Sequence, residues 1–235
     1  MSNPVITVIT PTTGSKSLNR LMESMNRQSV PWVHILLWDD KREGDCLHAD
    51  LSRIPINNLH EITGAKKQNC IRYSIVIPGS MIQGLACGSA LRSVGLMAAN
   101  TPYVTFADTD VWYDDNHLEL LLKAIGNKEW AYTVRRIWDN KLKCIGEDRF
   151  ESVGDDSKLT YKLVDNSSLL VGRKFGASAA CLYRETKEYN DDRLMFAFLK
   201  QYAGEPGKTN VATVNQICPQ RLEKMFRQYC VPIKK

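Results

Sequence analysis

The chain has 235 residues, 43% of them hydrophobic and 24% charged, which is typical of a globular protein and excludes a disordered or fibrous one. Its net charge of +5 comes from lysines and arginines scattered along the chain. A scattered excess of this size favours an anionic ligand and indicates no nucleic-acid-binding surface, so no nucleic acid is expected among the partners.

The cysteines and the first residues indicate the cellular compartment. Seven cysteines are dispersed along the chain, with no CxxC pair and no His/Cys spacing that matches a zinc site. Such a set is typical of reduced thiols in the cytoplasm. The opening "MSNPVITVIT" has no basic region followed by an apolar one, and no apolar run approaches the length of a bilayer span. We therefore expect a cytoplasmic protein.

The first three elements form a strand, helix, strand unit. The β-branched run "VITVIT" at 5–10 predicts a strand buried on both faces. From Ser17, a candidate N-cap, apolar residues recur at helical spacing up to Gln28. The run "WVHILLWDD" at 32–40 predicts a second strand, which ends in two aspartates. This order predicts a parallel pair of strands.

The following segments repeat that alternation. Residues 41–69 are polar and irregular, with a short helix expected near 46–51. A strand at 71–79, a helix at 88–100 and the strand "YVTFAD" at 103–108 come next. A helix at 115–126 follows, with Asp114 and Asp115 as its expected caps and Gly126 as its end. Strands separated by helices predict a doubly wound α/β half.

The second half changes character. "WAYTVRRIW" at 130–138 and "LTYKLV" at 159–164 predict strands, and "ASAACLYRE" at 177–185 suits either a strand or a helix. "DDRLMFAFLKQY" at 191–202 predicts an amphipathic helix that ends before Gly204. No flexible linker separates the halves, so we expect one compact domain with two functional halves.

Aspartates gather where predicted strands end. Asp39, Asp40, Asp108 and Asp110 all lie at the carboxyl ends of strands, where open α/β sheets bind ligands. In an extended segment Asp108 and Asp110 would point to the same side, and a cation would offset their repulsion. Mg²⁺ or Mn²⁺ held by these carboxylates and by phosphate oxygens fits this pattern. A solvated acidic turn is the alternative interpretation.

Together these stretches resemble the family 2 glycosyltransferases, which have the GT-A fold, from about Val5 to about Tyr202. The resemblance is carried by four stretches in order: "VITVITPTTGSKSLNRLMESMNRQSVPWVHILLWDD", "ALRSVGLMAANTPYVTFADTD", "SAACLYRE" and "NDDRLMFAFLKQYAG". It implies an α/β, Rossmann-like mixed sheet flanked by helices in a single domain, 1–235. The half 1–112 would bind the nucleotide-sugar and the half 113–235 the acceptor.

The resemblance also implies roles for individual residues. Nucleotide-sugar contacts are implied for Thr10, Pro11, Thr12, Asp39, Asp40, Arg92 and Asp108. Arg92 would lie near the diphosphate or Asp108, and Asp110, with Asp108, would ligate Mn²⁺ or Mg²⁺. Asp192, or else Asp191, would be the catalytic base, because both open a helix whose N-terminal dipole keeps a carboxylate ionised. Without the resemblance, both residues would be interpreted as helix caps.

The expected activity is metal-assisted transfer of one sugar, with inversion, from a nucleotide-sugar, expected to be a UDP-sugar, to a hydroxyl of a glycan, lipid-linked or protein acceptor. The sequence departs from the family pattern at Ser93, at Trp38 and at Asp191, which stands in place of Glu. The Q-x-x-R-W motif of processive synthases is absent, which favours transfer of a single residue.

Two other functions remain open. A sugar-nucleotide nucleotidyltransferase shares the acidic metal site, but it would open with a glycine-rich G-x-G-x-R loop that "TPTTGSKS" lacks. A GT-A-like domain could also bind a nucleotide or a glycan without turnover.

Some residues have two plausible roles. Trp112 and Trp138 are either core residues or a platform for a sugar ring, and His117 is a weak metal-ligand candidate. The C-terminal "RLEKMFRQYC" predicts a helix with an apolar face and a basic remainder. This helix either packs on the domain or makes peripheral contact with an anionic membrane.

Overall fold

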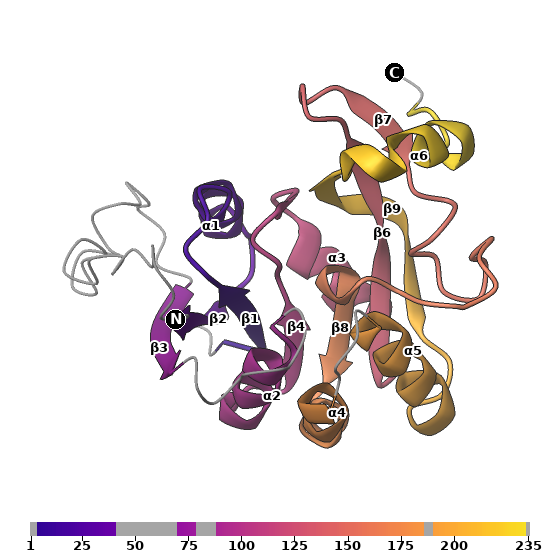
Figure 1. Ribbon diagram of the computed structural model, residues 1–235. Helices are drawn as coiled ribbons and strands as arrows, with labels where there is room; N and C mark the ends of the chain where they lie inside the picture. The colour runs from indigo at the N-terminus through magenta and orange to yellow at the C-terminus, as the bar shows by residue number, and fades with distance from the viewer. Residues whose placement is uncertain (1–3, 41–69, 79–87, 186–189, 234–235) are drawn as a thin grey trace.

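The computed structural model describes residues 4–40, 70–78, 88–185 and 190–233 (Figure 1). The short helix expected near 46–51 lies outside the described residues. The first half contains β1 Ile6–Thr12, α1 Leu18–Asn26, β2 Trp32–Asp40, β3 Cys70–Pro78, α2 Ser89–Ala98, β4 Tyr103–Phe106 and β5 Val111–Tyr113. The second half contains α3 His117–Ile125, β6 Trp130–Trp138, β7 Cys144–Glu147, the 3₁₀ turn η2 Asn166–Ser168, β8 Leu169–Gly172, α4 Arg173–Glu185, α5 Asp191–Tyr202, β9 Gly207–Ile217, the 3₁₀ turn η3 Gln220–Leu222 and α6 Glu223–Tyr229.

Within the described residues, all the strands join one mixed sheet in the order β3-β2-β1-β4-β8-β6-β9-β5, with β7 added to β6. The strands β3, β2, β1 and β4 are parallel, as the alternation of strands and helices predicted. From β4 onward the pairs are antiparallel, except that β6 and β9 run parallel. The predicted halves therefore share a continuous sheet, and a boundary at 112 falls inside β5.

Helices cover both faces of the sheet, so β1, β2 and β4 are buried on both sides, while the edge strand β3 exposes Ile71 and Tyr73 (Figure 1). On one face α2, α4 and α5 pack against alternate residues such as Ile9 and Leu37. On the other face α1 and α3 pack against Ile6 and Val8. This alternation follows from the period of two in a strand and explains why "VITVIT" has no polar face.

Several elements differ from their predictions. Residues 159–164 form no strand and make only a single bridge, Gly154 to Leu163, while β5, β7, β8 and β9 were not predicted. The caps predicted for α3 are wrong. Asn116 occupies the N-cap without a side-chain bond, Asp114 pairs with Arg136, and Asp115 pairs with Arg27. Each of these carboxylates instead forms an ion pair with an arginine from another part of the chain.

The C-terminal helix α6 packs on the domain. Phe226 is buried beside Ile137 and Phe150, and the ring of Tyr229 stacks on Phe150 with 4.6 Å between centroids. The apolar face predicted from the sequence is therefore directed at the protein's own core. Over the described part of the chain, none of the helices combines the length and the apolar character needed to cross a bilayer.

Candidate active site

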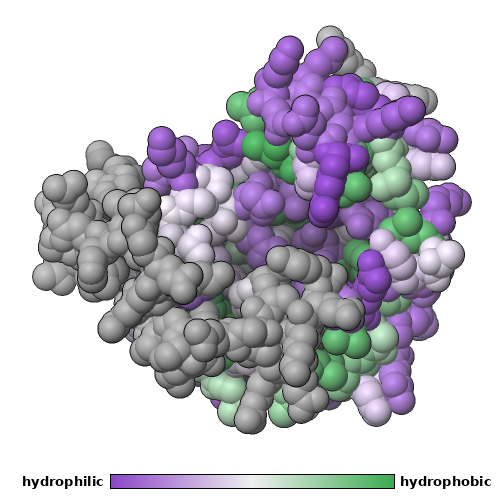
Figure 2. All heavy atoms as spheres, viewed as in Figure 1, coloured by the Kyte–Doolittle hydropathy of each residue, from purple (hydrophilic) through white to green (hydrophobic). Residues whose placement is uncertain are grey.

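The ends of three parallel strands lie side by side. Thr12 of β1 is level with Trp38 of β2, and Ile9 of β1 is level with Phe106 of β4. The residues after these positions, Asp39 and Asp108, therefore lie at the same edge of the sheet. In the view of Figure 2, hydrophilic residues gather near the middle of the molecule. The edge predicted from the strand ends is thus assembled in the fold.

Three residues at the end of β1 were predicted to contact the nucleotide. They differ in burial and in the hydrogen bonds that they already make. The Thr10 side chain is fully buried and its hydroxyl lies 2.9 Å from His34 Nε2. The Thr12 hydroxyl accepts a bond from the backbone of Gly14, and Pro11 is partly exposed. A contact from Thr10 to a ligand would therefore come from its backbone. Asp39 is partly buried, and the side chain of Asp40 lies outside the described residues.

Arg92 connects three segments of the chain. It lies in the first half of α2 and is 5% exposed. Its guanidinium donates to Asp108 at 2.5 Å and to Asp191 at 2.8 Å. Burial lowers the pKa of Arg92, but the two carboxylates outweigh that effect and raise it. Arg92 is therefore a permanent cation between the strand-end aspartate and the acidic start of α5, beside Asp108 as the resemblance implied.

Asp108 and Asp110 lie in a turn, not in the extended segment on which the prediction relied. The N–H of Val111 bonds back to the carbonyl of Asp108 at 3.3 Å. Asp110 is exposed, yet the surrounding protein partly desolvates its carboxylate and raises its pKa to about 6. The negative charges of Asp108 and Asp165 add to this rise. The two aspartates still affect each other electrostatically, because a turn also brings residues i and i+2 close.

The two aspartates at the start of α5 have different surroundings. Asp191 is 8% exposed and accepts from Arg92 and from the hydroxyl of Ser89. Asp192 is half-buried, and its Oδ1 accepts the backbone N–H of Asn166 at 3.1 Å. Burial raises the pKa of Asp192 well above its ordinary value, and the negative charges of Asp165 and Asp191 raise it further. Asp191 is a structural ion-pair partner, whereas Asp192 is a comparatively basic carboxylate.

Sequence reasoning missed the residues that support Asp192 and Asp108. Asp165 caps the turn η2 through the N–H of Ser167, and the hydroxyl of Ser167 accepts the N–H of Asp108 at 3.2 Å. The signal was present in "KLVDNSS", where an Asp followed by Ser marks a turn. It was overlooked because 159–164 was interpreted as a strand.

The remaining candidates are two tryptophans and a histidine. Trp112 and Trp138 pack on each other with ring centroids 5.7 Å apart, and the Arg20 guanidinium lies 4.8 Å from the ring of Trp112. His117 is a core histidine: it is 1% exposed, its Nδ1 lies 2.8 Å from the Thr213 hydroxyl, and burial lowers its pKa to about 3. A buried ring with these contacts is not placed as a surface metal ligand.

The carboxylates at the strand edge suit a divalent cation that also binds a ligand's phosphates. Among the described residues, no group of three or more His, Cys, Asp or Glu is arranged to hold a metal on its own. The pKa of Asp110 is nevertheless raised, by lost hydration first and by two neighbouring carboxylates second, and a bound cation would favour its charged form. One or two carboxylates completed by phosphate oxygens and water are the usual Mg²⁺ ligands at nucleotide sites.

Comparison with known proteins gives a fold but no family. No protein-family model matches the sequence, and no curated protein matches it. Among solved structures, S. aureus TarS 1–349 matches with a TM-score of 0.62 at 16% identity, covering 90% of this chain and 60% of TarS 1–349. Its complex with UDP-GlcNAc matches with a TM-score of 0.63 at 15% identity over 92% of this chain and 59% of the other, and its UDP complex with 0.59 at 16% over 94% and 62%.

The chain spans about three fifths of the length of these TarS chains. Identities this low carry information on the fold alone. The continuous mixed sheet with helices on both faces and the match over nine tenths of the chain lead to one conclusion: the chain has a GT-A fold.

Proposed function

We propose that the protein is an inverting glycosyltransferase that moves one sugar from a UDP-sugar to an acceptor hydroxyl with the help of Mn²⁺ or Mg²⁺. The observation that carries the proposal is the ion-paired set Arg92, Asp108 and Asp191, with Asp192 beside it at the carboxyl edge of a GT-A sheet. These residues come from three distant segments. UDP and UDP-GlcNAc are bound by the TarS structures of similar fold, which supports a UDP-linked donor.

Asp192 is the proposed catalytic base. The acceptor oxygen would attack the anomeric carbon as the bond from that carbon to the diphosphate oxygen breaks, and Asp192 would take the hydroxyl proton. Its raised pKa makes it a stronger base than an ordinary aspartate. Asp191 is less suited to this role because Arg92 and Ser89 occupy its carboxylate.

The other charged residues would hold the donor. Asp110, with Asp108, is proposed to hold the cation, and Asp39 or Asp40 would contact the base or ribose. A bound divalent cation would offset the negative charge that develops on the departing diphosphate. Arg92 fixes Asp108 in place and adds a positive charge near the same edge. Glycan, lipid-linked and protein acceptors all remain compatible with the proposal.

The proposal also covers where the protein acts in the cell. We propose a cytoplasmic protein that can make peripheral contact with a membrane through basic residues around α6. Arg221 and Lys224 are exposed there, while Phe226 anchors the helix to the domain. Sedimentation with anionic vesicles, compared with neutral ones, would test this contact.

Release of UDP from a panel of UDP-sugars, with and without Mn²⁺, tests the activity directly. We expect slow donor hydrolysis by the wild-type protein with at least one sugar, and faster release when a suitable acceptor is present. The Asp192→Asn variant should bind the donor normally and lose transfer by about 10²-fold or more. Transfer at the wild-type rate by this variant would remove Asp192 from the base role.

A further inference from the structure

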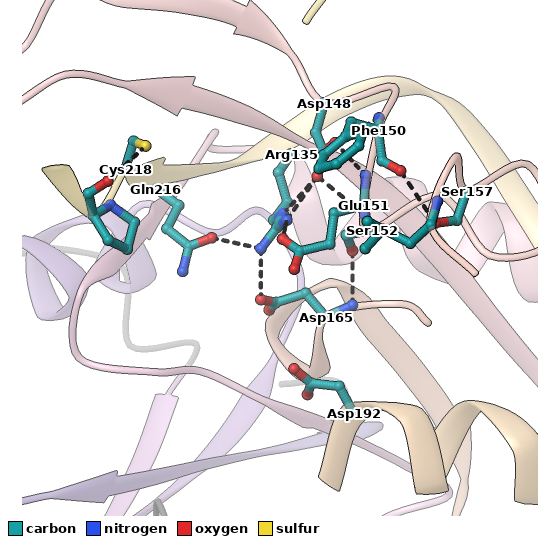
Figure 3. Close-up of polar contacts among 12 residues, drawn as sticks. Arg135, Asp148, Phe150, Glu151, Ser152, Ser157, Asp165, Asp192, Gln216 and Cys218 are labelled. Atoms are coloured by element: carbon teal, nitrogen blue, oxygen red, sulfur yellow. Dashed lines mark hydrogen bonds and ion pairs between the residues drawn. The ribbon is translucent and has the colours of Figure 1, made fainter. Parts of the chain in front are cut away.

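Beside the candidate site, Arg135 of β6 forms a buried cluster with acidic and amide side chains (Figure 3). The arginine is 4% exposed. Its guanidinium donates to four side chains, namely Asp148 at 2.6 Å, Gln216 at 2.7 Å, Asp165 at 2.9 Å and Glu151 at 2.9 Å. Burial lowers the pKa of Arg135, but the three carboxylates outweigh burial and raise it. The cluster is therefore held by a permanent cation that can only donate hydrogen bonds.

One contact leads from Arg135 toward the proposed cation ligand. The Gln216 Oε1 accepts from Arg135, so the amide is turned with its NH₂ group away from the guanidinium. The side chain of Gln216 also lies beside Asp110, where it partly offsets the rise in the pKa of that carboxyl, and a carboxylate can interact favourably only with the NH₂ group. Arg135 thereby fixes which way the amide points, and so which of its groups Asp110 meets. We call this path, Arg135 to Gln216 to Asp110, the cation arm.

A second contact leads toward the proposed base. Asp165 accepts from Arg135 through Oδ2 and from the N–H of Ser167 through Oδ1, so it holds the turn η2 in place. In that turn the N–H of Asn166 donates to Asp192, which projects toward Asp165 in Figure 3. We call this path, Arg135 to Asp165 to η2 to Asp192, the base arm.

The cluster also fixes the loop from which Asp165 extends. Asp148 follows β7 and accepts backbone N–H bonds from Phe150, Glu151 and Ser152 at 2.9–3.1 Å, while its Oδ2 pairs with Arg135. The hydroxyl of Ser152 in turn accepts the N–H of Asp165 at 2.7 Å. Asp165 is therefore held through both its side chain and its backbone N–H, unlike a residue on an unsupported loop.

We propose that Arg135 is a positioning residue that sets Asp110 and Asp192 relative to one another, with Gln216 and Asp165 as its two contacts toward the site. The roles of Asp110 and Asp192 rest on the proposed function. A guanidinium suits this task because its planar fork can satisfy several acceptors in fixed directions, whereas an ammonium group cannot. If so, a substitution in one arm should impair only the residue at the end of that arm.

The cation arm is tested with Gln216→Met, which keeps the length of the side chain and removes both polar groups. Binding of Mn²⁺ in the presence of UDP, measured by the paramagnetic resonance signal of free Mn²⁺, should weaken about 10–100-fold. The matched control is Arg136→Ala. Arg136 is the next residue on β6 and contacts Asp114 and Asn215, outside the cluster, so Mn²⁺ affinity should stay at the wild-type value.

The base arm is tested with Asp165→Asn, which keeps an oxygen for the N–H of Ser167 but loses the charge that pairs with Arg135. The kcat for UDP release should fall about 10–100-fold while the KM for the UDP-sugar stays unchanged. Arg135→Lys should produce both defects. If that variant does not fold, the two single-arm variants still decide the matter.

The outcomes separate this inference from the proposed function. Wild-type protein that binds no Mn²⁺ with UDP would overturn the cation role and the cation arm together. Wild-type protein that binds Mn²⁺, with Gln216→Met binding equally well or Asp165→Asn retaining full kcat, would overturn the positioning role alone and leave Arg135 as a structural residue.

Discussion

Among single residues, Asp191 and Asp192 show how different surroundings give two identical side chains different properties. Asp191 turns toward a buried arginine and forms an ion pair with it. Asp192 turns toward the turn η2 and toward other carboxylates, so its ionised form is disfavoured. Asp191 is therefore suited to a structural role, and Asp192 to the proposed role of base. Their separate effects on folding and on transfer can be measured.

We expect Asp192→Asn to stabilise the fold at neutral and alkaline pH. The pKa of Asp192 is raised in the folded state, so the ionised side chain costs stability as pH rises through that pKa, and the cost disappears near the ordinary aspartate pKa of about 4. The variant should melt above wild type at pH 8, by about 2–4 °C per kcal/mol recovered, and the difference should shrink toward pH 5. A melting temperature below wild type at pH 8 would contradict this account.

The neighbouring change, Asp191→Asn, should destabilise the fold by about 1.5–3 kcal/mol, because Arg92 loses a buried charged acceptor. Urea unfolding measures the loss. Asp115→Asn is the control, since Asp115 and Arg27 form an exposed ion pair that should contribute at most about 1 kcal/mol. Equal losses of unfolding free energy in the two variants would show that the buried Arg92–Asp191 pair contributes no more stability than an exposed ion pair.

The sequence predicted site residues that lie at or beside a strand end. It missed residues whose importance depends on contacts with a distant loop or strand. Arg92 was expected near Asp108 and is bonded to it. Arg135, Asp165 and Gln216 were not singled out, because their significance lies in contacts between β6, β9 and the loop after β7. Such contacts join residues up to 81 positions apart, which no local pattern records.

At the scale of elements, α2 must lie very close to the sheet to place Arg92. A Cβ at Gly95 would collide with Ile9 and would come within 2.9 Å of Leu37 Cδ1. Gly95→Ala should therefore overpack this contact at a cost of about 1–3 kcal/mol, more than the helix gains from alanine. The exposed Met97→Ala on the same helix should change the unfolding free energy by less than about 0.5 kcal/mol. A denaturation midpoint unchanged by Gly95→Ala would refute the close packing.

Elements with a strong hydrophobic period were predicted to within a few residues, including β2, β6 and α5. The missed strands β5, β7 and β8 are only three or four residues long, too short for a period to emerge. The 11-residue β9 was missed because "GKTNVATVNQI" is largely polar. Its inward threonine and asparagine side chains are satisfied by hydrogen bonds to other parts of the sheet, including Thr133 and Trp138.

At the scale of the whole molecule, one sheet brings the two proposed halves to a common edge. The parallel strands contribute Asp39 and Asp108, while β6, β9 and α5 contribute Arg135, Gln216 and Asp192. A donor bound by the first group would therefore face a base supplied by the second. We propose that this edge binds a nucleoside diphosphate together with a divalent cation.

Calorimetric titration of UDP into the protein, with and without Mn²⁺, measures this binding. We expect wild-type protein to bind UDP more tightly with Mn²⁺ than without it, and we expect Asp110→Ala to lose this enhancement while it remains folded. Binding of UDP that is equally tight in both proteins and indifferent to Mn²⁺ would contradict the account.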